Sequence, residues 1–143
     1  MSEPVMLLAE SFWEEMAFEG SGPALWKSIN DGLSNVFFSR LALLLDMQEI
    51  ELAELLAIKV STRRRWSKAG KLSCAESDLL YGVSEVFRDL LSLYEGDVNA
   101  ALRWLDTPAR ALNHIPPASF FTNHVGIKLL KIHIWRIEHG VAG

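Results

Sequence analysis

Cationic side chains gather between residues 59 and 71, where they could bind a polyanion. The cations of this segment are Lys59, Arg63, Arg64, Arg65, Lys68 and Lys71, and it contains no acid. Lysine and arginine neutralise phosphates, and an arginine can pair with both acceptor atoms on the major-groove edge of guanine. This composition favours double-stranded DNA as a partner. The residues expected to contact it are Lys59, Ser61, Thr62, Arg64, Arg65, Lys68 and Lys71.

Residues 48–58, which precede the basic segment, could form the helix that positions it. This stretch is acidic and amphipathic, and the apolar residues that it offers for packing are Leu52, Ala53, Leu55 and Leu56. A packing helix, a short turn and a basic helix in this order are typical of a helix-turn-helix. Ala57 occupies the turn position that usually holds glycine, and Arg63 replaces an apolar inward residue. We expect Trp66, one turn after Arg63, to supply the missing burial.

The net charge of -4 is distributed unevenly along the chain. Residues 1–58 carry ten acids and two bases, and residues 72–143 carry eight acids and six bases. The basic segment therefore stands on an acidic body, which fits DNA binding. A solvated helix face, or a docking site for an acidic protein, would have the same composition, so these two interpretations stay open.

The cysteine and the histidines of the chain indicate neither an enzyme nor a metal site. These residue types often serve as nucleophiles and metal ligands. Cys74 is the single cysteine, which excludes an internal disulfide and suits a reducing cytoplasm. It lies between a capping serine and glutamate, where a small filler is expected, so we predict no catalytic residue. The histidines at 114, 124, 133 and 139 form no pair with metal-ligand spacing on one helix. We expect no metal and no cofactor.

Helical spacing of apolar residues, with almost no strand-like alternation, predicts an all-α fold. The expected helices include residues 5–18, 23–30, 35–45 and 122–138. Ser73 and Glu76 form a capping box that starts a further helix, and Gly96 ends it. Within 35–45 the residues expected to be buried are Val36, Phe37, Leu41, Leu44 and Leu45. The last helix is apolar on more than one side, which is typical of a helix buried in a core or shared with another chain.

The chain length of 143 residues, half of them hydrophobic, predicts one core of ordinary size. The start of the sequence has an apolar run but no cationic region before it, so we predict no secretory signal. No stretch reaches transmembrane length without charge. We therefore expect a soluble, cytoplasmic protein with no membrane partner.

Three sets of motifs carry a resemblance to a known family. They are KAGKLS at 68–73 with ESD at 76–78, WLxTP at 104–108, and RIEHGV at 136–141. On these residues the chain resembles the Xre/MbcA/ParS antitoxins of bacterial toxin–antitoxin pairs, over roughly residues 32–141. The family usually has asparagine after the ThrPro and glycines before the next proline, whereas this chain has Ala109, Asn113 and His114.

The resemblance implies an Xre-like helix-turn-helix bundle with a C-terminal helical toxin-binding domain. The regions expected are an N-terminal helical appendage at 1–31, a DNA-binding region at 32–95 and a toxin-binding domain at 96–143. Dimer contacts are one possible role of the appendage. The resemblance also implies a partner toxin with a RES domain that consumes NAD+, whose active site the C-terminal segment blocks. The residues expected to contact this toxin are Trp104, Thr107, Pro108, Arg136, Glu138, His139, Gly140 and Val141.

The function expected from the sequence is a type II antitoxin that also represses its own operon. A symmetric homodimer is expected, because one recognition helix reads too few base pairs to be selective, and the toxin would enlarge the assembly. A stand-alone helix-turn-helix regulator that responds to a small ligand is the main alternative, and it predicts an apolar pocket. A structural adaptor whose basic helix binds protein is the third. For Arg136, Glu138 and His139, a solvated helix end is the simpler interpretation.

Overall fold

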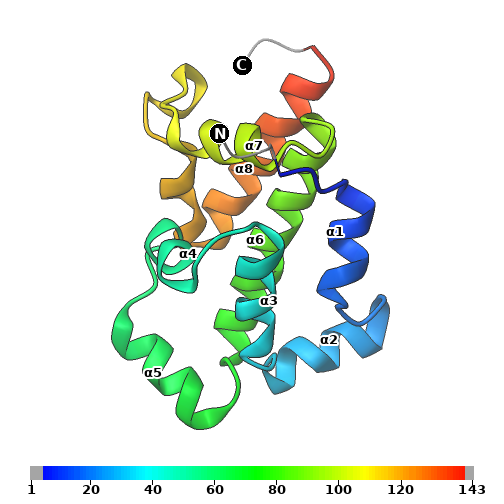
Figure 1. The fold of residues 1–143 in the computed structure, drawn as a ribbon, viewed down its shortest axis with the longest axis vertical. Coiled ribbons are helices and arrows are strands. Elements are labelled where there is room, and N and C mark those ends of the chain that lie inside the picture. The colour runs from blue at the N-terminus through cyan, green and yellow to red at the C-terminus, as the bar shows by residue number, and fades with distance from the viewer. Residues whose placement is uncertain (1–4, 141–143) are drawn as a thin grey trace.

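The computed structural model of the chain describes residues 5–140, which form helices joined by turns and short loops, with no strand among them. The all-α helix-turn-helix bundle expected from the sequence is confirmed. In chain order (Figure 1) the elements are α1 (Ala9–Met16), α2 (Gly22–Asp31), α3 (Val36–Leu44), α4 (Glu49–Leu55), α5 (Val60–Ala69), α6 (Cys74–Leu93), α7 (Val98–Asp106), the 3-10 helices η1 (Arg110–Leu112) and η2 (Pro117–Thr122), and α8 (His124–Glu138).

Helix α6 is the longest element and forms the centre of the bundle (Figure 1). Helices α1, α2, α7 and α8 and the η2 helix all contact it. The fully buried side chains of α6 include Val86, Phe87, Leu90 and Leu91. Phe12 and Met16 of α1 are buried in the same core, so the N-terminal helix is packed onto the body of the protein.

The N-terminal helix begins later than the sequence predicts. A helix was expected over residues 5–18, but α1 starts at Ala9. The backbone N–H of Leu7 donates to the carbonyl of Gly96 at 2.7 Å, and that of Val98 donates to the carbonyl of Val5 at 3.2 Å. These backbone bonds hold residues 5–7 extended beside the turn between α6 and α7, which removes them from the helix.

The buried face of α3 includes Leu41 and Leu45, as predicted, but is rotated about the helix from the face expected. Its core residues recur at intervals of three and four and are Phe38, Leu41, Ala42 and Leu45. Val36 falls outside this series and is 51% exposed, so the prediction that it is buried is wrong. Phe37 and Leu44 are partly buried. Just before the helix, the Ser34 hydroxyl accepts a hydrogen bond from the backbone N–H of Val36 at 3.2 Å.

Polar side chains fix where the C-terminal helices begin. The predicted capping box opens α6: the Ser73 hydroxyl accepts from the backbone of Glu76 at 3.1 Å, and the Glu76 carboxylate accepts from the backbone of Ser73 at 2.9 Å. Asp97 caps α7, and Asn123 caps α8. Each such cap typically stabilises a helix start by about 1 kcal/mol.

Helix α8 is apolar on two sides, as predicted, and only one side is covered. Ile127, Leu130 and Ile134 are buried against the bundle. The exposed apolar residues of the other side are Val125, Leu129, Ile132 and Trp135. Within residues 5–140, no helix combines the length and the apolar character that a membrane crossing requires.

Candidate functional site

Helices α4 and α5 meet at a tight turn that directs α5 away from the core. A capping box formed by Gln48 and Glu51 starts α4. In the turn, Ala57 has a φ of 56°, the left-handed conformation that favours glycine. Helix α5 then runs along the edge of the molecule, at the lower left of Figure 1.

One buried side chain anchors α5 to the bundle. Trp66 is 5% exposed and packs on Phe38 of α3, with ring centroids 5.4 Å apart. No other residue of α5 is buried. Arg63 takes the inward position one turn earlier and places its guanidinium 5.7 Å from the centre of the Phe38 ring and 3.8 Å from the carboxylate of Glu49. The prediction that Trp66 replaces an apolar residue at position 63 is confirmed.

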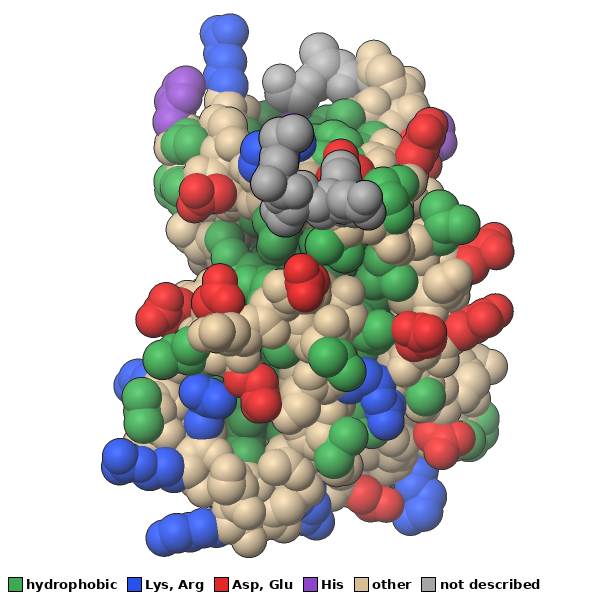
Figure 2. All heavy atoms as spheres, in the orientation of Figure 1, with side chains coloured by type: hydrophobic (Ala, Val, Ile, Leu, Met, Phe, Trp, Pro, Cys, Tyr) green, Lys and Arg blue, Asp and Glu red, His purple; other side chains and the backbone are tan. Residues whose placement is uncertain are grey.

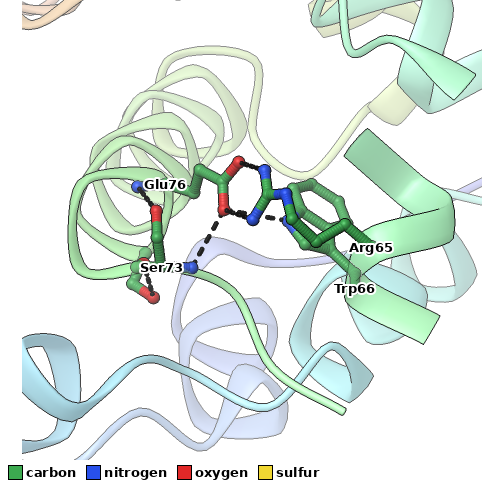
Figure 3. Close-up of polar contacts among 5 residues, drawn as sticks. Arg65, Trp66, Ser73 and Glu76 are labelled. Carbon is green, nitrogen blue, oxygen red and sulfur yellow. Dashed lines mark hydrogen bonds and ion pairs between the residues drawn. The ribbon is translucent and has the colours of Figure 1, made fainter. Parts of the chain in front are cut away.

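A carboxylate on α6 holds the side of α5 (Figure 3). Glu76 Oε1 accepts from Arg65 Nη1 at 3.0 Å and from Trp66 Nε1 at 3.0 Å, and Glu76 Oε2 accepts from Arg65 Nη2. The same carboxylate caps α6 at Ser73. Glu76 therefore ties the basic helix to the first turn of α6. The sequence indicated the cap but not the contacts with α5.

The Glu76 contacts favour its ionised form. The hydrogen bond from Arg65 lowers the pKa of Glu76 to about 2, and the hydrogen bonds from Ser73 and Trp66 act in the same direction against desolvation. The same pairing raises the pKa of Arg65. Arg65 was expected to contact DNA, but in this structure its guanidinium is occupied by Glu76, although its side chain is 53% exposed.

The other residues expected to contact DNA lie mainly on the outer side of α5. Lys59, Ser61, Arg64 and Lys68 are exposed, and Thr62 is half-buried towards α6. Lys71 lies beyond the helix, where its ammonium donates to the carbonyl of Asp31 at 3.2 Å. Figure 2 shows lysine and arginine side chains gathered over the part of the surface where α5 lies. The outer side of α5 is thus cationic and open to a partner.

The 104–108 motif and the last helix lie close together. Trp104 of α7 is half-buried and stacks on His133 of α8, with ring centroids 5.8 Å apart. Burial lowers the pKa of His133, and the nearby charge of Arg136 lowers it further. Thr107 donates its hydroxyl hydrogen to the carbonyl of Arg103 at 2.7 Å and ends α7, and Pro108 is exposed. The 104–108 motif therefore contacts α8 at His133, three residues before Arg136.

The residues at the end of α8 are presented to solvent. Arg136, Glu138, His139 and Gly140 are all exposed, and Val141 lies outside the described residues. The His139 ring stacks on Trp135 at 4.1 Å between centroids, and its Nδ1 lies 2.8 Å from the Trp135 carbonyl oxygen. This contact folds the histidine back onto the helix end. It leaves Arg136 and Glu138 available for a partner.

A pocket of about 300 Å³ opens between the helix-turn-helix and the C-terminal part of the chain. Its apolar walls come from Leu56 and Ile58 in the turn, Leu79 and Val83 on α6, and Phe121 on η2. Lys59, Thr62 and Glu76 supply polar groups at its edge. Neither the helical spacing nor the motifs of the sequence indicated this pocket.

Potential nucleophiles and metal ligands are dispersed in the structure. Cys74 is an exposed free thiol in the first turn of α6. His124 pairs with Asp78 on the surface, with His124 Nε2 2.9 Å from Asp78 Oδ2. Among residues 5–140, no three side chains of histidine, cysteine, aspartate or glutamate are arranged to hold a metal ion.

Two curated proteins are similar to this chain over most of its length. One, from Photorhabdus laumondii subsp. laumondii, is named Antitoxin Xre and is 28% identical over 131 residues, which cover 90% of this chain and 88% of that protein. The other, from Yersinia enterocolitica, has the same name and is 28% identical over 133 residues, covering 92% and 90%. No family model matches the chain. The two relatives support a role in a toxin–antitoxin system.

Proposed function

We propose that this chain is a non-enzymatic antitoxin that neutralises a partner toxin and binds the DNA of its own operon. The observation that carries the proposal is the similarity to two proteins named Antitoxin Xre along about nine tenths of the chain. The two exposed regions of the fold agree with it. One is the cationic outer side of α5, and the other comprises the 104–108 turn and α8 from His133 to its exposed end.

The proposed DNA interface is the outer side of α5. Trp66 packs α5 on the bundle, so Arg64 and Lys68 on the opposite side are free to face a major groove. We propose that Lys59, exposed at the helix start, contacts a phosphate. Binding as a symmetric dimer would present two such helices to paired half-sites, with the N-terminal region available for dimer contacts.

The proposed toxin interface is formed by the 104–108 turn and the end of α8. Arg136 and Glu138 offer charge-assisted hydrogen bonds, and the Trp104–His133 stack holds the 104–108 turn beside α8. We propose that the partner carries a RES domain that consumes NAD+. In this proposal the C-terminal segment enters the active site of the toxin and blocks it.

Co-expression with the product of the adjacent open reading frame tests the antitoxin role. The neighbour alone is expected to stop growth and deplete cellular NAD+, and this chain is expected to restore both. A neighbour that does not inhibit growth, or one whose inhibition this chain fails to relieve, would show that the antitoxin assignment is wrong.

Retardation of DNA from upstream of the gene tests the regulatory role. Arg64 is proposed to pair with a base, so Arg64→Ala is expected to weaken DNA binding by about 1–3 kcal/mol. Lys59→Ala removes one proposed phosphate contact, so it should reduce the slope of the logarithm of the binding constant against the logarithm of salt concentration by about 1. Glu54→Ala, on the exposed side of α4, is the control and should not weaken binding. A chain that binds protein but retards no DNA at moderate salt would indicate the adaptor function.

A ligand-responsive regulator is the second candidate function, and the pocket between the turn, α6 and η2 favours it. A volume of about 300 Å³ lies at the lower end of the range for small-molecule sites, and the walls are mainly apolar. Under this function the adjacent gene would not encode a toxin. Co-expression therefore distinguishes the two candidates.

A further inference from the structure

Val60 is an exposed aliphatic side chain in a cationic surface, and packing within the chain does not account for it. It is the first residue of α5, and its side chain is 63% exposed. The other exposed residues of the helix are Ser61, Arg64, Arg65, Ser67, Lys68 and Ala69. Val60 is the only large apolar side chain among them. An exposed valine in such a surface suggests contact with an apolar group on the partner.

The periodicity of the helix places Val60 beside the proposed base-reading residues. Val60, Arg64 and Lys68 recur at intervals of four, so they share one side of α5, and Trp66 anchors the opposite side. Val60 and Arg64 also line the same shallow hollow between α3, α4 and α5. The N-terminal residues of a recognition helix are the ones that reach base edges.

Chemistry identifies the group that an exposed valine can contact in a major groove. The C5-methyl of thymine is the apolar feature that base pairs display there, whereas guanine presents two acceptors to arginine. We propose that Val60 contacts the methyl group of a thymine in each operator half-site, beside a guanine that Arg64 contacts. This inference rests on the proposed DNA-binding function and adds a specificity-determining residue to it.

Deoxyuridine substitution tests the methyl contact directly. Duplexes bound by the full chain are selected from a random library, and each thymine of the selected half-site is then replaced singly by deoxyuridine, which removes only the methyl group. At one thymine the replacement is expected to weaken binding of the wild-type chain roughly fourfold, as loss of one buried methyl implies. Val60→Ser is expected to bind the thymine and deoxyuridine duplexes with equal Kd.

Val125→Ser is the matched control, because Val125 is 71% exposed near the start of α8. This variant is expected to keep the fourfold discrimination. A selected half-site without thymine would overturn the inference, as would a wild-type chain indifferent to the methyl at every thymine, or a Val60→Ser variant that still discriminates. These outcomes leave the DNA-binding function intact. Failure to bind any duplex at low salt would overturn both proposals.

Discussion

Helices α5 and α8 carry the two proposed interfaces, and the fold holds them in different ways. Helix α5 buries only Trp66 and is fixed at its side by the surface carboxylate of Glu76. Helix α8 buries several residues, among them Ile127, Leu130 and Ile134, against α6 and η2. One buried tryptophan and the polar contacts of Glu76 therefore position α5, whereas a broad apolar side positions α8.

Because of this difference, some substitutions should affect one interface and others should affect the whole protein. Apolar burial is the dominant stabilising contribution to a fold, so a change within α8 reaches the shared core. A change at α5 or Glu76 alters a helix that contributes little to that core. The outer side of α5 can therefore vary without unfolding the protein. At α8, this freedom belongs to the exposed residues at its end and on its outer side.

The largest expected effect comes from the buried side of α8. Leu130 is 0% exposed, and Leu130→Ala should lower the free energy of unfolding by about 2–5 kcal/mol, measured by urea denaturation. Its neighbour Leu129 is 43% exposed, so Leu129→Ala is the matched control and should cost less than about 1 kcal/mol. Equal costs for the two variants would contradict the packing described for α8.

A smaller effect is expected at the polar attachment of α5. Because the pKa of Glu76 is lowered to about 2, its contacts stabilise the fold fully above the unfolded-state pKa near 4.5. This contribution should be lost as pH falls towards 2. Glu76→Gln should remove about 1–2 kcal/mol at pH 7, since solvent screens a pair this close to the surface.

The pH dependence of unfolding separates this contribution from a simple loss of packing. Between pH 5 and 2, the stability of Glu76→Gln should fall less steeply than that of the wild type. Glu54→Gln, on the exposed side of α4, is the control and should retain the wild-type slope. Parallel slopes for wild type and Glu76→Gln would show that Glu76 does not hold α5.

The smallest effect is expected at the turn before α5. Ala57 has a left-handed φ of 56°, so Ala57→Gly should relieve strain and raise stability by about 0.5–1 kcal/mol. Ala75→Gly, at an exposed position within α6, should instead lower stability by a similar amount. Differential scanning calorimetry of the two variants measures whether each one is more or less stable than the wild type. A destabilised Ala57→Gly variant would contradict the strain assigned to the turn.

Features set by neighbouring residues could be predicted from the sequence. The Ser73–Glu76 capping box and the burial of Trp66 each depend on a few adjacent positions, and both predictions are confirmed. The all-α fold followed from helical spacing in the same way. For the candidate site, however, only the residue types could be predicted. Their contacts with DNA and toxin stay predictions.

Features that depend on the angle between elements could not be predicted. Arg65 was taken as a free cation, but the crossing of α5 and α6 places it on Glu76. The exposure of Val36 depends on which side of α3 faces α1 and α4, and apolar residues on both sides leave this choice open. The backbone pairing of residues 5–7 with the turn after α6 joins segments far apart in the chain.

We propose that one small fold carries two separable interfaces, and crossed variants test this separability. Growth rescue from the toxin and retardation of operator DNA are measured for the Arg64→Ala/Lys68→Ala variant and for the chain lacking residues 138–143. We predict that the first variant protects cells but does not retard DNA, and that the truncated chain retards DNA but does not protect. If both variants fold and each loses both activities, the two interfaces are not separable. If the truncated chain still protects cells, the C-terminal segment does not block the toxin.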